Sequence, residues 1–334
     1  MTIIIAEAGV NHNGDLSIAK QLVKVAKDAG ADFVKFQTFK ADQLVLRSAS
    51  LADYQKNNLR SEKSQFEMLK DLELSDEAHR ELWTFCADLG IKFLSTPFDE
   101  RSLNFLLELG CKTIKIPSGE LTNFFLLEAA AKVNFPTILS TGMASEVEIH
   151  EALACLVDNG LDRDNLMLLH CTTEYPCPYD DVNLSAITEM QRIFRLPIGY
   201  SDHTNGIDVA GAAVALGAAV IEKHFTLDRG MAGPDHLASI EPVELKAMVD
   251  LIRIMERCRG DGIKIAQKSE SKNILIARKS LVAKHKIDKG EKFSRENVMA
   301  KRPANGINPM LFPQLIGKVA HRSFAQDEQI EIED

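Results

Sequence analysis

The stretch Ile3-Ile4-Ile5-Ala6-Glu7 is a short apolar run that ends at a carboxylate, and a second run, Phe33-Val34, ends at Lys35. Between them lies a segment with apolar residues at helical spacing. Asp15 is placed to cap this helix at its start, and Gly30 is placed to end it. A strand, a helix and a second strand in this order predict two parallel strands joined by a helical crossover.

The same pattern continues along the chain, where further apolar runs stop at polar residues and helix-like segments separate them. The later runs end at Ser95-Thr96, Ser118, Ser140, His170 with Thr172, Ser201 with His203, and Glu222 with His224. Eight such units predict an α/β fold, the (β/α)8 or TIM barrel. Because active sites of this fold lie where the carboxyl ends of the strands meet, we expect these polar residues to share one site.

Length predicts a second domain. The chain has 334 residues, whereas a barrel typically needs about 250. We predict a catalytic barrel over residues 1–258 and a linker rich in Gly, Lys and Ser over 259–277. A small domain of short strands, broken by prolines and glycines, is expected over 278–334. Its core would be thin, so it should lean on another surface for stability.

Composition excludes several classes of function. The net charge of −9 argues against nucleic-acid binding. No apolar stretch approaches the roughly 18 residues of a membrane span, so we expect a cytoplasmic protein without membrane contact. We find no glycine-rich nucleotide motif and no Cys-x-x-Cys spacing, so the six cysteines are expected to be buried thiols.

Two lysines and three serines suggest a site for a small anion. Lys35, Lys115, Ser118, Ser140 and Ser201 lie at or near five different strand ends. Ammonium groups supply charge and hydroxyls supply directed donors, as a phosphorylated carboxylate requires. The lysines could instead pair with nearby glutamates or form a Schiff base.

Histidines and glutamates at strand ends suggest a metal and proton transfer. His203 and His224 end adjacent strands and could face one divalent ion, with Mn²⁺ expected first and Mg²⁺ or Co²⁺ as alternatives. Glu7, Glu120 and Glu222 could position a water, bind a polyol or act as general acid or base. They could equally neutralise the lysines, and the sequence does not rank them.

The segment from Ala41 to Leu74 is too long for a plain loop. It carries Tyr54, Gln55, Asn57, Asn58 and Arg60, and we interpret it as an excursion over the barrel mouth, with a surface insertion as the alternative.

Read together, the strand-end motifs resemble those of the sialic acid synthases, within the wider group of nonulosonate synthases, over almost the whole chain. The motifs are residues 6–14 (AEAGVNHNG), 34–38 (VKFQT), 95–99 (STPFD), 115–120 (KIPSGE), 140–143 (STGM), 170–176 (HCTTEYP), 199–204 (GYSDHT), 222–226 (EKHFT), 233–236 (GPDH) and 301–306 (KRPANG).

This resemblance implies a barrel followed by an antifreeze-like (SAF, β-clip) domain, in a domain-swapped homodimer where each tail caps the barrel of its partner. It also implies that phosphoenolpyruvate condenses with an open-chain 2-acetamido-mannose-type sugar, giving phosphate and a nine-carbon 2-keto acid. The metal would polarise the sugar aldehyde for attack by C3 of the enol phosphate.

The resemblance also assigns roles by matched position. Phosphoenolpyruvate would be held by Lys35, Thr96, Lys115, Ser118, Ser140 and Ser201, and the metal by His203 and His224. The sugar would meet Gln37, Glu120, Tyr175 and Asp235, and Arg302 would reach its N-acyl group from the other protomer. For handling the attacking water or its proton we choose Glu7 first and Glu222 second.

The sequence leaves the acceptor sugar open. N-acetylmannosamine is expected first, as the commoner acceptor, ahead of a 2,4-diacetamido-2,4,6-trideoxyhexose as in legionaminic or pseudaminic acid synthesis. The Ala41 to Leu74 segment and the Thr173-Glu174 pair are the expected discriminators. A Schiff-base aldolase and a non-catalytic sugar-binding protein are the more remote alternatives.

Overall fold

The computed structural model describes residues 1–52, 55 and 63–332 of the chain. Its internal contacts divide the chain into two compact units, Met1–Gly260 and Asp261–Asp334. Within the described residues, no helix combines the length and the apolar character needed to cross a membrane.

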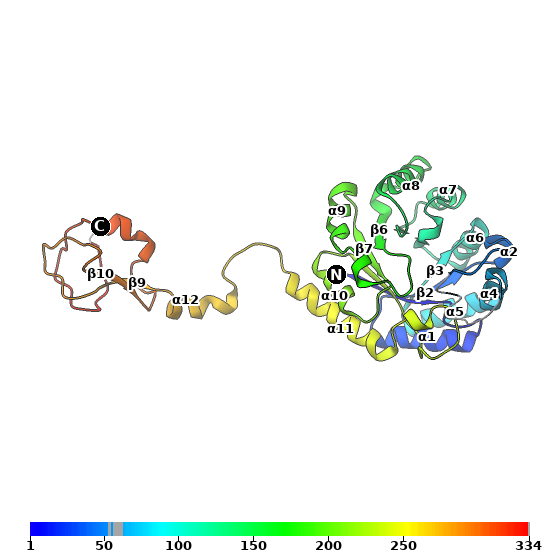
Figure 1. The fold of residues 1–334 in the computed structure, drawn as a ribbon, viewed down its shortest axis with the longest axis horizontal. Coiled ribbons are helices and arrows are strands. Elements are labelled where there is room, and N and C mark those ends of the chain that lie inside the picture. Colours follow the sequence, from blue (N-terminus) through cyan, green and yellow to red (C-terminus); the bar gives the residue numbers. More distant parts are fainter. Residues whose placement is uncertain (53–54, 56–62, 333–334) are drawn as a thin grey trace. The chain divides into compact units, whose positions relative to one another are not determined.

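Eight parallel strands form the centre of the first unit (Figure 1). They hydrogen-bond in the order β3-β2-β1-β8-β7-β6-β5-β4, and the two ends of this order, β3 and β4, lie next to each other. The sheet is therefore a nearly closed barrel, and the predicted fold is confirmed. The strands are β1 (Ile3–Gly9), β2 (Phe33–Thr38), β3 (Lys92–Pro97), β4 (Ile114–Ile116), β5 (Thr137–Ser140), β6 (Leu166–Cys171), β7 (Ile198–Asp202) and β8 (Val220–His224).

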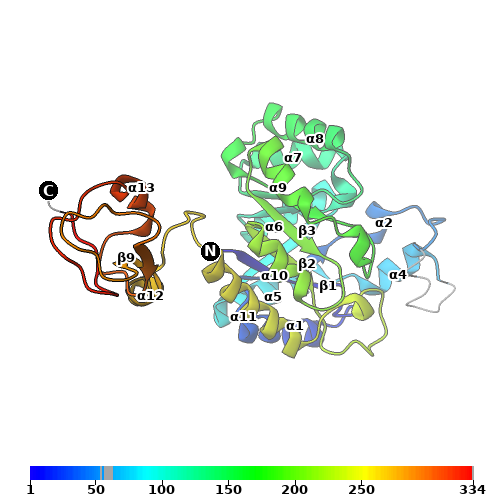
Figure 2. The ribbon, with the colours of Figure 1, turned by 60° about the vertical axis from the view of Figure 1, so that its left-hand side comes forward.

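Helices surround the strands, as the view in Figure 2 shows. They are α1 (Leu16–Ala29), α5 (Asp76–Leu89), α6 (Glu100–Leu109), α7 (Phe124–Val133), α8 (Glu146–Asp158), α9 (Ser185–Phe194), α10 (Asp208–Ala215) and α11 (Pro242–Arg259). The predicted limits of α1 are confirmed: Asp15 accepts hydrogen bonds from the N–H groups of Ser17 and Ile18, and Gly30 ends the helix at φ 89°. That left-handed backbone suits glycine because it has no Cβ.

Two apolar layers position the site. The larger core fills the space between the strands and the surrounding helices. A smaller cluster lies inside the barrel and consists of Ile5, Leu94, Ile138, Leu169 and Val220. This inner cluster forms the floor of the barrel mouth, and the polar groups of the mouth lie one layer above it.

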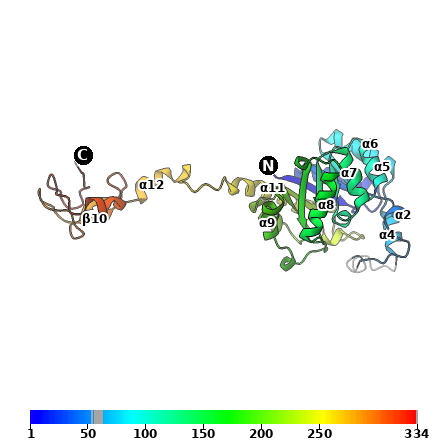
Figure 3. The same ribbon diagram turned by 90° about the horizontal axis from the view of Figure 1, so that it is seen from above.

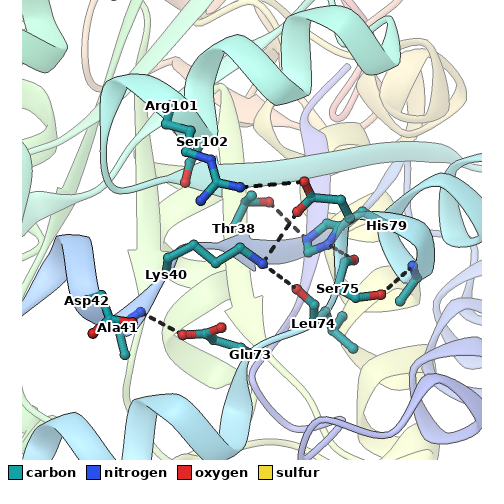
Figure 4. Close-up of polar contacts among 12 residues, drawn as sticks. Thr38, Lys40, Ala41, Asp42, Glu73, Leu74, Ser75, His79, Arg101 and Ser102 are labelled. Atoms are coloured by element: carbon teal, nitrogen blue, oxygen red, sulfur yellow. Dashed lines mark hydrogen bonds and ion pairs between the residues drawn. The ribbon is translucent and has the colours of Figure 1, made fainter.

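The described residues of the Ala41 to Leu74 segment include the short helices α2 (Ala41–Leu44) and α4 (Gln65–Leu72). Its two ends are tied together, since the Ala41 N–H donates to Glu73 Oε1 at 2.7 Å and Lys40 Nζ donates to Leu74 O at 3.4 Å (Figure 4). Tyr54, Asn57, Asn58 and Arg60, noted in the sequence, lie outside the described residues.

The second unit has a small core of its own. It contains α12 (Ser271–Ala277), the antiparallel strands β9 (Ser280–Ala283) and β10 (Val298–Lys301), and the short helix α13 (Phe312–Leu315) (Figure 3). Apolar side chains such as Leu281, Phe293 and Phe324 are buried there. Helix α12 falls within residues 259–277, so part of the segment predicted as a linker is helical.

Candidate active site

A cavity of about 310 Å³ lies at the carboxyl ends of the barrel strands. Every site residue predicted within the barrel lines it. These are Glu7, Lys35, Gln37, Thr96, Lys115, Ser118, Glu120, Ser140, Tyr175, Ser201, His203, Glu222, His224 and Asp235. Side chains separated by more than 200 positions in sequence therefore meet in one space, as the barrel hypothesis requires.

Strand alternation explains much of this convergence. Glu7, Thr96, Ser140, Cys171 and Glu222 each follow a floor residue by two positions, so their side chains point into the barrel one layer higher. Register then aligns the layer across strands. Glu7 lies opposite Lys35 on one side and His224 on the other, and Ser201 lies opposite Cys171 and Glu222.

Two ammonium groups and two carboxylates form the centre of the cavity. Lys35 Nζ lies 2.8 Å from Glu7 Oε2 and 3.6 Å from Glu222 Oε2, and Lys115 Nζ lies 3.6 Å from Glu222 Oε1. The lysines also donate to hydroxyls, Lys35 to Thr96 at 3.0 Å and Lys115 to Ser140 at 2.7 Å. The lysines thus pair with Glu7 and Glu222 and still face the cavity.

The two carboxylates differ in acidity. Burial raises the pKa of Glu7 to about 7, although Lys35 acts in the opposite direction. Burial also opposes ionisation of Glu222, but Lys115, Lys35 and a 2.9 Å hydrogen bond from Ser201 outweigh it and lower its pKa. Glu7 is therefore the carboxyl group poised to exchange a proton near neutral pH, while Glu222 stays ionised.

The two histidines are buried side by side with ring centroids 5.7 Å apart. Burial lowers the pKa of His203 to about 4 and the pKa of His224 well below 6.5, so both imidazoles are neutral, which is the form that binds metals. His203 Nδ1 donates to Thr172 O at 2.6 Å, so the lone pair of this ring is on Nε2, which lies 3.3 Å from Ser201 Oγ. His224 Nδ1 is buried and has no hydrogen-bond partner among the described residues.

This donor set fits a divalent cation held by two imidazoles. In the described part of the chain, no group of three or more His, Cys, Asp or Glu residues is arranged to hold a metal. The remaining ligands would therefore have to come from water or substrate oxygens, as is common in open catalytic sites.

Hydroxyl groups line the wall beside Lys115. Ser118 Oγ accepts a hydrogen bond from the Gly142 N–H at 3.0 Å and lies 3.2 Å from Cys171 Sγ. Thr173 Oγ1 is buried next to them without a hydrogen-bond partner in the part of the chain that the structure describes. Cys171 was predicted only as a buried thiol, although its position two residues after Leu169 is a signal for the cavity.

The residues predicted to meet the sugar lie around these groups. Gln37 Nε2 donates to Glu7 Oε1 at 3.4 Å, and the Tyr175 ring lies 4.2 Å from the His203 ring, centroid to centroid. Glu120 accepts from Asn123 at 2.6 Å, and burial raises its pKa. Burial also raises the pKa of Asp235, to about 6.

Two protein-family models match this chain, one over most of the barrel and one over the C-terminal residues. The sequence model of the NeuB family matches residues 22–264, and that of the SAF domain matches residues 278–334. The chain belongs to the NeuB family. It is an enzyme of the NeuB type, and the predicted SAF domain is confirmed.

NeuB relatives match along nearly the whole chain. An N,N'-diacetyllegionaminic acid synthase of Campylobacter jejuni is 55% identical over 329 residues, which is 98% of each chain. A protein of the same name from Legionella pneumophila is 49% identical over 317 residues, 94% of this chain and 89% of that protein. The crystal structure of an N-acetylneuraminic acid (sialic acid) synthetase from Leptospira borgpetersenii has a TM-score of 0.72 and 37% identity, over 82% of this chain and 90% of that chain.

Two further predictions concern residues that are not part of this cavity lining. Arg302 is exposed in the second unit, directly after β10, and its contact with the sugar of a partner protomer stays a prediction, as does the homodimer. The expectation of six buried thiols is wrong for Cys258, which is exposed at the end of α11, and for Cys155 on α8, which is only partly buried. A helix end near solvent leaves such a side chain uncovered.

Proposed function

We propose that this enzyme condenses phosphoenolpyruvate with an open-chain 2,4-diacetamido-2,4,6-trideoxyhexose, giving phosphate and an N,N'-diacetyllegionaminate-type nine-carbon 2-keto acid. The choice of acceptor follows the comparisons. The two legionaminic acid synthases are 55% and 49% identical to this chain, against 37% for the N-acetylneuraminic acid synthetase. They favour the second acceptor considered from the sequence over N-acetylmannosamine.

One observation carries the reaction class: two ammonium groups, several hydroxyls and two neutral imidazoles line a single cavity. Phosphoenolpyruvate carries a phosphate and a carboxylate, and both require charged and hydroxyl donors. Lys35 and Lys115 supply the charge, while Thr96, Ser118, Ser140 and Ser201 supply hydroxyls. A divalent cation bound by His203 and His224 would supply Lewis-acid polarisation of the sugar aldehyde.

The side chains support the bond changes in order. C3 of phosphoenolpyruvate bonds to the aldehyde carbon, the aldehyde oxygen receives the electron pair of the C=O bond and takes up a proton, and water adds to C2. Glu7 takes the proton of that water, because its raised pKa matches proton exchange near neutrality. The C2–O bond to phosphate then breaks as the new C2 hydroxyl loses its proton and becomes the keto group, and Lys35 and Lys115 stabilise the charge that leaves with the phosphate. Ionised Glu222 holds both lysines and Ser201 in place throughout.

A phosphate-release assay tests this function. The enzyme with Mn²⁺ is mixed with phosphoenolpyruvate and, in parallel, with a 2,4-diacetamido-2,4,6-trideoxyhexose or N-acetylmannosamine. We expect phosphate release with the diacetamido sugar at the higher kcat/KM, loss of activity in EDTA and recovery on adding Mn²⁺. Higher kcat/KM with N-acetylmannosamine would overturn the acceptor.

The remote alternatives make different predictions in the same experiment. A Schiff-base aldolase would be trapped on Lys35 or Lys115 by borohydride with substrate and would be indifferent to EDTA. A sugar-binding protein would release no phosphate with any acceptor.

A further inference from the structure

The cavity has a second kind of lining besides its charged centre. Apolar side chains from the loops after β1, β2 and β3 and from the α2 and α4 region form what we call the apolar wall. Its members are Val10, Phe39, Leu44, Val45, Met68, Leu69, Leu72 and Phe98. Most of them pack together in one hydrophobic cluster, separate from the main core. The wall is thus a coherent surface that faces the substrate space.

We propose that the apolar wall selects the acceptor sugar by receiving its C6 methyl end, which is an inference that rests on the proposed function. The aldehyde carbon of the sugar must meet C3 of phosphoenolpyruvate, which the ammonium groups hold at the centre of the cavity. The other end of the open-chain sugar therefore extends away from the charged groups and toward the remaining lining.

The chemistry of the wall distinguishes a methyl group from a hydroxymethyl group. Gln55 and Gln65 also line this part of the cavity, but the leucine, valine and phenylalanine side chains of the wall offer no hydrogen bond and methionine only a weak one. A C6 hydroxyl seated against the wall itself would therefore lose water without gaining a comparable partner. A C6 methyl group has no hydrogen bond to water to lose, and its contact with the wall buries apolar surface. A difference of one such group in an apolar pocket corresponds to about 10- to 100-fold in kcat/KM.

The wall is held in shape at its base. Ala41 and Lys40 at its start bond to Glu73 and Leu74 at its end, and Lys40 also lies 3.4 Å from Asp76 (Figure 4). Nearby, Thr38 Oγ1 lies 3.0 Å from His79 Nε2, which joins β2 to α5. These contacts fix the distance between the wall and the strand ends, so the wall is positioned before the sugar binds.

Two acceptors that differ only at C6 test the proposal. One is a 2,4-diacetamido-2,4,6-trideoxyhexose, and the other has the same configuration but keeps the C6 hydroxyl. For the unchanged enzyme we expect the 6-deoxy sugar to be preferred by about 10- to 100-fold in kcat/KM. Leu69→Gln, a change that keeps side-chain length and helix propensity on α4, should reduce this preference by about tenfold. The KM for phosphoenolpyruvate should not change.

Leu46→Gln is the matched control, because Leu46 lies in the same segment, is 79% exposed and is not part of the cavity lining. Its preference should equal that of the unchanged enzyme. Val45→Thr, which keeps shape and adds one hydroxyl, provides the same test if Leu69→Gln does not fold. Phosphate release with equal kcat/KM for the two sugars, or an unchanged preference in both wall variants, would overturn this inference alone. No release with either sugar would overturn the proposed function instead.

Discussion

Lys115 and Lys223 are both buried lysines on barrel strands, yet their surroundings differ. Lys223 donates to Asp202 Oδ2 at 2.8 Å and to Thr204 O at 2.6 Å, while the other oxygen of Asp202 accepts from the N–H and hydroxyl of Thr204. This closed group does not line the cavity. Lys115 instead shares Glu222 with Lys35 and faces the substrate space.

The difference separates a structural ion pair from a functional one. Asp202 and Lys223 neutralise each other's charge and satisfy each other's hydrogen bonds together with Thr204, so they fix the loop that follows β7 and contains His203. The charged groups around Lys115 are held by partners but still open onto a cavity, so they can rearrange around an incoming anion. Variants should therefore lose folding stability at the first group and activity at the second.

The largest effect is expected for Lys223→Met. It leaves the Asp202 carboxylate buried without its cation, which should lower the free energy of unfolding by about 3–5 kcal/mol. Urea unfolding measures this loss. Lys246→Met, which breaks an exposed pair with Asp250 on α11, is the matched control and should change stability little. A small loss in Lys223→Met would mean that the pair is not structural.

Lys115→Met should mainly affect activity. Glu222 keeps Lys35 and Ser201 as partners, so no buried charge is abandoned. We expect kcat/KM for phosphoenolpyruvate to fall about 10²- to 10³-fold, because a charged donor to the departing phosphate is lost. Steady-state phosphate release gives this value, and urea unfolding should show a smaller loss than for Lys223→Met. The reverse ranking in both assays would contradict the distinction drawn above.

Asp235→Asn should stabilise the ligand-free protein in a pH-dependent way. Burial raises the pKa of Asp235 from 3.8 to about 6, which corresponds to roughly 3 kcal/mol. Below the unfolded pKa both states are protonated and the burial costs nothing electrostatically. As the pH rises from 3.8 to about 6, the unfolded state ionises while the buried carboxyl stays protonated, so the native state loses stability, and this loss is complete above about 6. The variant should thus be more stable at pH 8 and similar near pH 4 in urea unfolding. An equal difference at both pH values would contradict burial as the cause.

The smallest effect is expected for Gly142→Ala. A methyl group at Gly142 would overlap Thr173 Oγ1 and lie 2.8 Å from Ser118 Oγ. The Thr173 and Ser118 side chains must therefore shift, at a cost of about 1–3 kcal/mol. The KM for phosphoenolpyruvate should rise as well. Gly119→Ala meets nothing within 4 Å and serves as the stability control. Equal stability in the two variants would show that the close approach at Gly142 is not required.

Much of the site was predictable because the same strand-helix unit repeats around the barrel. Each apolar run ends at the same edge of the sheet, so Lys35, Ser140 and His224 were assigned to one site from their positions at run ends alone. Alternation by two also places Cys171 in the cavity, although it was predicted only as a buried thiol. The apolar wall could not be predicted in the same way. Its members lie on helices and loops, where side chains do not alternate every two residues as they do along a strand.

By itself, the sequence determined the strand and helix order, the caps such as Asp15 and Gly30, and the residues that end each strand. These features depend on local periodicity and backbone preference. Only the tertiary structure decided that Lys35 pairs with Glu7 and shares Glu222 with Lys115, and that Lys223 turns away to Asp202. Register, barrel closure and burial set those distances and the resulting pKa values, and none of them is a property of a residue's immediate neighbours in the chain.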